Sequence, residues 1–138
     1  MTKKLIGRVE TADFPDLGLI NVPVKIDTGA YTSSIHYQEM TEKNSKLYCV
    51  FNNFPKNSFK RQVVVFEDFR TTLDKSSNGI PQKRYKIKTT VIFFQKKYKI
   101  SLTLAKRKSM RYPALLGRKF LSGKFVIDSS RVNLSKNK

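Results

Sequence analysis

Alternation of apolar and polar side chains is the feature that most constrains how this chain folds. Between Tyr85 and Phe93, apolar and β-branched side chains interleave with Lys86, Lys88 and Thr90. A period of two is typical of a half-buried strand. The same period recurs from Ile100 to Leu104. Shorter runs rich in β-branched or aromatic residues add strand candidates at Leu5–Val9, Ile20–Ile26, Leu47–Phe51, Val63–Phe66 and Phe125–Asp128. The sequence therefore predicts an all-β chain.

One segment, Leu115–Leu121, favours a helix, because Leu116, Phe120 and Leu121 share a helical face. The chain is long enough for one domain with a real core, and it has no interdomain linker. We therefore expect one domain over residues 1–134 with one short C-terminal helix. The polar residues 135–138 are expected to form a frayed basic tail.

Three polar stretches mark the connections between the expected strands. Gln95, Lys96 and Lys97 predict a hairpin turn between the two strands with the clearest alternation. Asn52–Ser58 and Asp74–Pro81 are crowded with turn-forming residues and are predicted loops.

The charge of the chain makes nucleic acid a partner to consider. A formal net charge of +18 arises from 28 Lys and Arg against 10 Asp and Glu, and such an excess attracts polyanions. The favoured interpretation is that lysines are spread over strand faces for solubility, since no compact Arg-rich run occurs. Apolar residues at 39% and aromatic residues at 12% exclude a disordered basic tail.

The single cysteine and the hydropathy pattern predict a compartment. Cys49 lies in an apolar run and has no intrachain partner for a disulfide, so a buried inert thiol in a reducing environment is expected. The N-terminus lacks the apolar core of a signal peptide, and no long apolar stretch occurs elsewhere. The expectation is a cytoplasmic protein without a membrane partner.

The stretch with most chemical content is Val24–Ala30, an apolar strand that ends in Asp27, Thr28, Gly29 and Ala30. Such a strand delivers a carboxylate to a tight turn that a glycine permits and a threonine hydroxyl rigidifies. Taken alone, this pattern fits a capped turn as well as a catalytic loop.

A second stretch of sequence favours the catalytic loop over the capped turn. Pro113–Leu121 contains two leucines, a glycine and an arginine, and the strand Phe125–Asp128 follows it. Together with Asp-Thr-Gly-Ala, these segments resemble the retropepsin family of aspartic proteases. The sequence resembles even more closely a bacterial retropepsin-like family long labelled ATP-dependent zinc protease. The segments that carry this resemblance are Ile6–Glu10, Lys25–His36 and Met110–Arg118.

The resemblance implies a single-lobe acid protease barrel of the retropepsin type, in which Asp27 is the catalytic carboxylate. Thr28, Gly29 and Ala30 form the active-site loop, and Leu115, Leu116, Gly117 and Arg118 support it. One motif is half a site, so a homodimer related by a twofold axis is expected. Two adjacent carboxylates share one proton and activate a water against a peptide or protein substrate, behaviour for which aspartic proteases are the standard example.

Two further features follow from the resemblance. A hairpin flap covers the substrate in retropepsins, and its candidates here are Asn78 and Gly79, between expected strands near Val63–Phe69 and Gln82–Phe94. An ordinary hairpin loop fits equally. Ala30 stands where some aspartic proteases carry Ser or Thr, so one hydroxyl donor to the carboxylate pair is missing. Activity nearer neutral pH is therefore expected.

The chain departs from the family pattern in two places. Retroviral members carry an acid after Asp-Thr-Gly-Ala that pairs with the later arginine, whereas Tyr31 stands here, so Arg118 loses that partner. Ala105 precedes Lys106 and Arg107 where bacterial relatives tend to have an acid before the arginine, so a local charge pair is also expected to be lost.

The zinc label finds little support in the residues. A zinc site needs three or four clustered ligands, and the chain offers His36 and Cys49 without a His-Glu-x-x-His motif. We therefore expect no metal, no ATP and no other cofactor. A hydrogen-bonded structural role is favoured for His36 over a catalytic one.

Two rival functions remain open from the sequence. The first is a basic β-barrel that binds nucleic acid, using lysines interleaved with Tyr85 and Tyr98. It leaves the Asp27 motif without a role, and core packing explains the aromatic alternation as well. The second rival is a peptide-binding domain of the protease fold that does not cleave.

Overall fold

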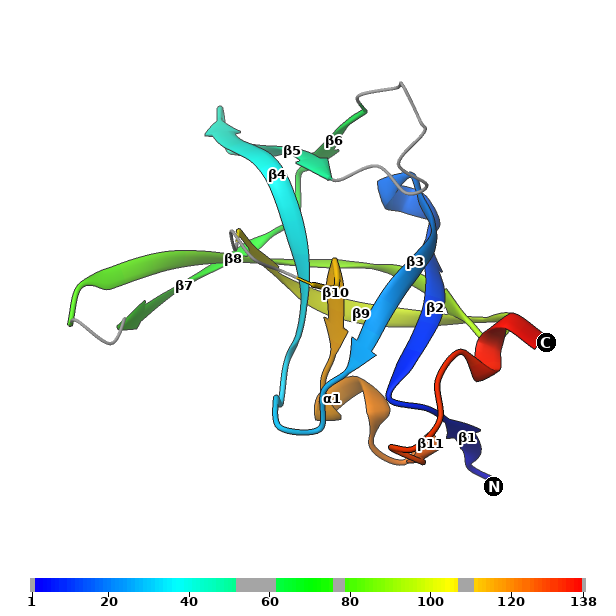
Figure 1. Ribbon diagram of the computed structural model, residues 1–138. Coiled ribbons are helices and arrows are strands. Elements are labelled where there is room, and N and C mark those ends of the chain that lie inside the picture. The colour runs from blue at the N-terminus through cyan, green and yellow to red at the C-terminus, as the bar shows by residue number, and fades with distance from the viewer. Residues whose placement is uncertain (1, 52–61, 76–78, 107–110, 138) are drawn as a thin grey trace.

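The computed structural model describes residues 2–51, 62–75, 79–106 and 111–137. Six strands form a closed barrel (Figure 1). They are β2 (Val9–Phe14), β3 (Leu19–Ile26), β4 (Ser33–Lys43), β8 (Pro81–Phe93), β9 (Lys96–Ala105) and β10 (Ala114–Leu116). They follow the order β10-β3-β2-β8-β9-β4, and pairing of β10 with β4 closes the ring. The predicted all-β, single-lobe barrel is confirmed.

The short strand β10 lies between the two strands that flank Asp27. It pairs in parallel with β3, with Leu116 opposite Ile26, and antiparallel with β4, with Leu115 opposite Ser34. Since β3 and β4 are consecutive in the chain, a late segment is inserted between two early ones. This insertion holds the connection between β3 and β4 at one end of the barrel, beside the helix α1 (Arg118–Leu121) (Figure 1).

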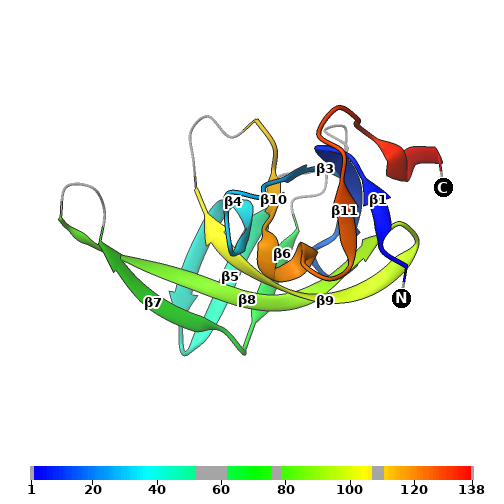
Figure 2. The same ribbon diagram turned by 90° about the horizontal axis from the view of Figure 1, so that it is seen from below.

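Two hairpins extend from the barrel. The outer half of β4 pairs with β5 (Lys46–Phe51), which pairs with β6 (Val63–Phe66). The first half of β8 pairs with β7 (Arg70–Lys75), and this hairpin projects away from the barrel in both views (Figures 1 and 2). Figure 2 also shows β1 (Lys4–Ile6) beside β11 (Phe125–Ile127), with which it forms a small parallel sheet.

The core follows the alternation in the sequence. Ile87, Val91 and Phe93 of β8 are at most 1% exposed, as is Leu102 of β9. Phe93 makes edge contacts with Phe120 of α1 and Phe125 of β11, with ring centroids 6.2 and 5.3 Å apart. These aromatic contacts fix α1 and β11 to the end of the barrel that carries the connection between β3 and β4.

The predicted helix over residues 115–121 is partly wrong. Only Arg118–Leu121 is helical, and Leu115 and Leu116 belong to β10. Leu116 is buried and pairs with Ile26 of β3, and its carbonyl accepts the N–H of Asp27. Pairing of Leu115 and Leu116 with β3 therefore overrides the helical spacing of the apolar residues. Only the four residues Arg118–Leu121 form a helix.

The turn between β8 and β9 begins one residue earlier and ends two residues earlier than predicted. Phe94 and Gln95 have φ values of 52° and 64°, whereas Lys96 and Lys97 already belong to β9. Positive φ at two central residues is the geometry of a tight hairpin turn whose twist matches that of the strands. The predicted loop Asn52–Ser58 lies outside the described residues.

The C-terminal segment returns to the start of β2. Leu134–Asn137 forms a short 3-10 helix, η2, and a second one, η1, spans Pro15–Leu17. Ser135, placed by the sequence in a frayed tail, lies in η2, and its hydroxyl donates to Glu10 Oε1 at 2.7 Å. Across the described residues, no helix has the length and apolar character that crossing a bilayer requires.

Candidate active site

Asp27 lies directly after β3, where the barrel presents the end of that strand. Its backbone N–H donates to Leu116 O at 2.9 Å, so β10 fixes the position from which the carboxylate projects. The side chain is half-buried, and Thr28 and Gly29 are exposed. Gly29 N donates to Asp27 Oδ1 at 3.2 Å and Ala30 N to Asp27 O at 3.3 Å. The loop is therefore a tight turn built around a carboxylate that keeps most of its acceptor capacity.

Gly117 allows the segment after β10 to approach the loop closely. A Cβ atom at this position would lie 2.6 Å from Thr32 O and 2.8 Å from Tyr31 O, and both are backbone atoms. Its N–H donates to the hydroxyl oxygen of buried Ser33 at 2.9 Å. Only a residue without a side chain fits here, so the glycine sets the contact between the two segments.

Arg118 ties the loop to α1 by a route that the sequence did not indicate. Its Nη1 donates to Thr28 O at 2.8 Å, and its backbone N–H donates to Ala30 O at 2.9 Å. The guanidinium lies 5.8 Å from the centre of the Tyr31 ring, within cation-π range. Tyr31 therefore offers its ring where retroviral members carry an acid, and the arginine holds the loop through the carbonyl oxygen of Thr28.

The residues assigned to loop support do gather behind Asp27. Leu116 is buried and Leu115 is half-buried in β10, while Gly117 and Arg118 contact the loop itself. Ser33 is a further residue that supports the loop, and the sequence did not indicate it. The run Thr32–Ser33–Ser34 gives no sign of which hydroxyl turns inward, because that depends on the register between β4 and β10.

The candidate flap falls on the hairpin of β7 and β8. Gly79 lies just before β8 with φ +80°, and a Cβ there would meet nothing within 4 Å. Asn78 lies outside the described residues. The first arm of the hairpin is β7, whereas the expected arm was Val63–Phe69, of which Val63–Phe66 forms β6 and pairs with β5. The assignment of that arm was wrong because Arg70–Lys75 is too polar to stand out as a strand.

His36 lies in β4 and Cys49 in the neighbouring strand β5. The backbone N–H of His36 donates to Pro113 O at 2.8 Å, and burial lowers the pKa of its imidazole. Cys49 is fully buried in β5, and burial raises the pKa of its thiol to about 12. In the described part of the chain, no three His, Cys, Asp or Glu side chains form a group that could hold a metal ion.

A single Asp-Thr-Gly loop at the end of β3, backed by a strand inserted between β3 and β4 of a closed barrel, defines one lobe of the retropepsin type of acid protease fold. The family model described as retropepsin-like aspartic endopeptidase RimB matches residues 5–138. This chain belongs to that RimB-like family.

Curated relatives carry a different name. The chain is 34% identical over 134 residues to a protein of Shewanella pealeana and 32% identical to one of Desulfotalea psychrophila, both named "Probable alpha-L-glutamate ligase". Each match covers 93% of this chain but only 29% and 28% of the relatives. The chain therefore spans less than a third of the length of these proteins.

A solved structure supports the fold alone. A crystal structure of a protein of unknown function from Legionella pneumophila superposes with a TM-score of 0.71 at 23% identity. The match covers 97% of this chain and 99% of that one. The two chains therefore share the barrel with its appended hairpins.

Proposed function

We propose that this chain is an aspartic endopeptidase that acts as a homodimer, in which Asp27 from each copy contributes to one catalytic pair. The observation that carries the proposal is the setting of Asp27. Its backbone is fixed by β10, its loop is held by Arg118, and its carboxylate is half-exposed with a single described donor, Gly29 N. Rigid placement of an unsaturated carboxylate is what general acid-base catalysis requires.

The chemistry proposed for the pair needs only these two carboxyl groups and water. The ionised carboxylate takes a proton from a water bound between the two, and the resulting oxygen attacks the peptide carbonyl carbon. The protonated partner donates a hydrogen bond to the carbonyl oxygen as negative charge develops there. Collapse of the tetrahedral species breaks the C–N bond, and a proton passes to the leaving amine.

Exposed apolar side chains support dimerisation. Tyr31, next to the loop, is 59% exposed, and Leu5 and Val126 of the small β1–β11 sheet are 42% and 51% exposed. A second copy related by a twofold axis would cover such a surface with the same residues. The pairing would bring two Asp27 loops together at the seam.

Charge and the names of the relatives support an acidic substrate. The relatives are named for ligation of α-L-glutamate, and this chain carries a net charge of +18. We therefore propose glutamate-rich peptides as the substrate class, since a strongly basic enzyme attracts an acidic chain and repels a basic one.

The second candidate is a peptide-binding domain of the same fold that does not cleave. It is favoured by one observation, that the ligase-named relatives contain the matched segment within much longer proteins. In that role the loop would bind an acidic chain without hydrolysing it.

The test compares wild type with Asp27→Asn, and Asp16→Asn serves as a control because Asp16 is an exposed carboxylate of η1. Each protein is incubated with a mixed peptide library that contains glutamate-rich members, from about pH 4 to about pH 8. Products are read by mass spectrometry, with and without pepstatin and a chelator.

We expect cleavage by wild type and Asp16→Asn, unaffected by the chelator and reduced about 1,000-fold or more in Asp27→Asn. Retention of cleavage by Asp27→Asn would reject Asp27 as the catalytic group. A folded wild-type dimer that binds acidic peptides but cleaves none would favour the binding domain. Tight binding to RNA without any peptide binding would favour the basic barrel for nucleic acid.

A further inference from the structure

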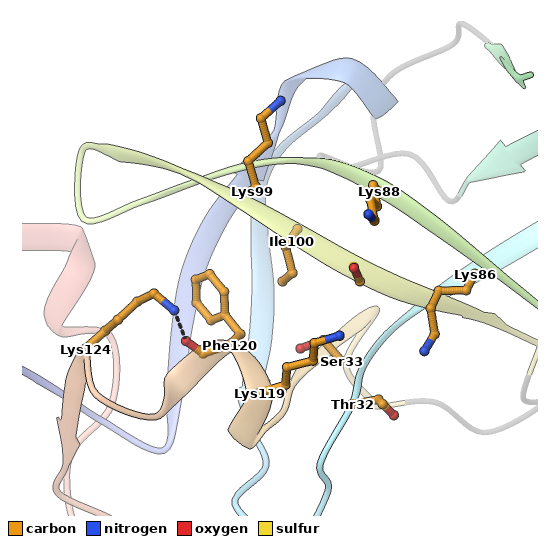
Figure 3. Close-up of a pocket in the computed structure, with 10 residues that line it drawn as sticks. Thr32, Ser33, Lys86, Lys88, Lys99, Ile100, Lys119, Phe120 and Lys124 are labelled. Atoms are coloured by element: carbon orange, nitrogen blue, oxygen red, sulfur yellow. Dashed lines mark hydrogen bonds between the residues drawn. The ribbon is translucent and has the colours of Figure 1, made fainter. Parts of the chain in front are cut away.

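A lysine-rich pocket opens beside the Asp27 loop, between α1, the start of β4 and the pair β8–β9 (Figure 3). Its volume is about 290 Å³. Ile100 and Phe120, each 5% exposed, provide apolar surface, and Thr32, Ser33 and Ser101 provide hydroxyl groups. The pocket thus combines an apolar base with polar walls, as ligand sites do.

Five lysines surround this pocket: Lys86, Lys88, Lys99, Lys119 and Lys124. None of its lining residues is an acid. Figure 3 shows Lys86 and Lys119 reaching into the space beside Thr32 and Ser33, while Lys99 points away from α1. Gathering ammonium groups in one place is unfavourable unless a negative charge joins them. The pocket is therefore complementary to an anionic ligand.

Among the described residues the five lysines form no ion pair, although the acid Asp68 lines an adjoining hollow with Lys86 and Lys88. The ion pairs of Lys46 with Glu67, Lys83 with Glu42 and Arg131 with Asp128 involve none of the residues that line the pocket. Lys124 donates to Phe120 O at 2.7 Å, which is a backbone carbonyl. The positive charge of the pocket is thus available to a ligand.

The shape of the basic surface favours an extended chain over a compact anion. A second hollow of about 70 Å³, lined by Asp68, Phe69 and Arg70, shares Lys86 and Lys88 with the first. Arg70 lies opposite Lys86 in the register of β7 and β8. The two hollows share these lysines and together form a track along β8, toward the projecting hairpin, that is basic apart from Asp68.

The spacing along this track fits a peptide in particular. Lys86 and Lys88 are two residues apart on β8, so they share a face and lie about 7 Å apart. Alternate side chains of an extended peptide have the same spacing. Acidic residues at every second position could therefore meet successive lysines.

The pocket also shares its wall with the support of the Asp27 loop. Ser33, which lines the pocket, accepts the N–H of Gly117. The backbone N–H of Lys119 donates to Tyr31 O at 2.9 Å. A chain held in the pocket would therefore lie next to the segment that positions Asp27, but outside the loop itself.

We propose that the lysine pocket is an exosite that binds side-chain carboxylates of an extended acidic segment of the substrate, apart from the residues that flank the cleaved bond. This inference rests on the proposed function for the origin of its ligand. The exosite adds affinity and does not take part in the reaction, so its loss raises KM and leaves kcat unchanged.

The experiment uses the full chain and matched double variants. Lys86→Gln with Lys88→Gln removes two charges from the pocket, and Lys96→Gln with Lys97→Gln removes two exposed charges from the start of β9, outside it. The matching double replacement by arginine at 86 and 88 tests rescue by charge. All are made in wild type and in Asp27→Asn, and the ligand is a fluorescent peptide that alternates glutamate and serine, with a glutamine and serine peptide as its neutral control.

Binding to the Asp27→Asn series is measured by fluorescence anisotropy, so the result does not depend on cleavage. We expect the pocket variant to bind the acidic peptide about five- to tenfold more weakly, the control variant within about twofold of its parent, and the arginine variant near its parent. The neutral peptide should bind weakly to all. Equal weakening in both glutamine variants would overturn the exosite, as would single-stranded RNA binding that depends on Lys86 and Lys88 when peptide binding does not.

Cleavage in the wild-type series separates this inference from the proposed function. We expect the pocket variant to show a KM raised by the same factor, with kcat unchanged. A fall in kcat alone would overturn an exosite role. If wild type cleaves nothing while the anisotropy pattern holds, the proteolytic function fails and the acidic binding site stands.

Discussion

Two carboxylates at the same end of the paired strands β2 and β3 have opposite surroundings. Glu10, opposite Val24 in the register, is fully buried and accepts hydrogen bonds from Gly7 N, Leu134 N, Ser135 N and the Ser135 hydroxyl at 2.7–3.2 Å. Asp27 is half-buried, and within the described residues its side chain accepts one hydrogen bond, from Gly29.

The number of hydrogen bonds distinguishes a carboxylate with a structural role, Glu10, from one that remains open to further contacts, Asp27. Each oxygen of Glu10 receives two donors, so its charge is stabilised and has no capacity left for a ligand. Asp27 has a fixed backbone and accepts one hydrogen bond among the described residues, so its carboxylate has acceptor capacity left for a water or a substrate group. Burial alone would therefore not distinguish a structural carboxylate from the one proposed to be catalytic.

The largest expected effect is on the Glu10 side of the comparison. Glu10→Gln places an NH₂ group against one of the two donor pairs, whichever way the amide turns, because both oxygens accept. We expect the free energy of unfolding to fall by about 3 kcal/mol, measured by urea denaturation. Asp16→Asn, an exposed acid-to-amide change, is the control, and equal small losses in both variants would contradict a structural role for Glu10.

Ser33→Ala tests whether the Asp27 loop depends on its brace in the same way. The change leaves the buried N–H of Gly117 without its acceptor, so we expect a loss of about 1.5 kcal/mol in urea unfolding. Ser34→Ala, at the neighbouring half-buried position, should cost less. A larger loss at Ser34 would show that the hydroxyl of Ser33 does not hold the loop.

Acid titration extends the comparison to Asp128, near the segment that Glu10 binds. The Ser130 hydroxyl, its N–H and then Arg131 hold the pKa of Asp128 below its ordinary value of 3.8. A lowered pKa adds stability above about pH 4 that is lost as the pH falls through the folded-state pKa. Asp128→Asn should therefore show a shallower decline of unfolding free energy from about pH 4 downward than wild type. Parallel curves would contradict the assigned contacts.

The smallest expected effect is on the stability of Asp27→Asn. The carboxylate makes one hydrogen bond within its own turn, and an amide oxygen can accept the same bond from Gly29. We expect a change within about 0.5 kcal/mol by urea denaturation at neutral pH. A loss comparable to that of Glu10→Gln would erase the distinction between the two carboxylates.

Strands with strong alternation could be read from the sequence, and polar ones could not. β8 and β9 carry regular apolar positions, and both were predicted within a few residues. β4 and β7 were missed because Ser33–Lys43 and Arg70–Lys75 are mostly polar, and their pairing with β9, β5 and β8 decides their conformation. Pairing between distant segments leaves little trace in local composition.

The candidate site was predictable in its parts but not in its contacts. Asp27 and Leu115–Arg118 were linked by a family resemblance, and they do lie together. The contact of Arg118 with Thr28 O could not be read from the sequence, because it depends on where α1 begins relative to the loop. Glu10 belonged to a recognised segment, yet nothing nearby in the sequence identified partners more than a hundred residues away.

The insertion of β10 between β3 and β4 has a consequence for synthesis of the chain. Strands β3 and β4 leave the ribosome early, but they cannot complete the barrel until residues 114–116 follow. The Asp27 turn therefore stays without its backing until most of the domain has been translated, and contacts of such long sequence separation form slowly. A nascent chain would thus carry Asp27 for most of its synthesis without the contacts that position it in the folded domain.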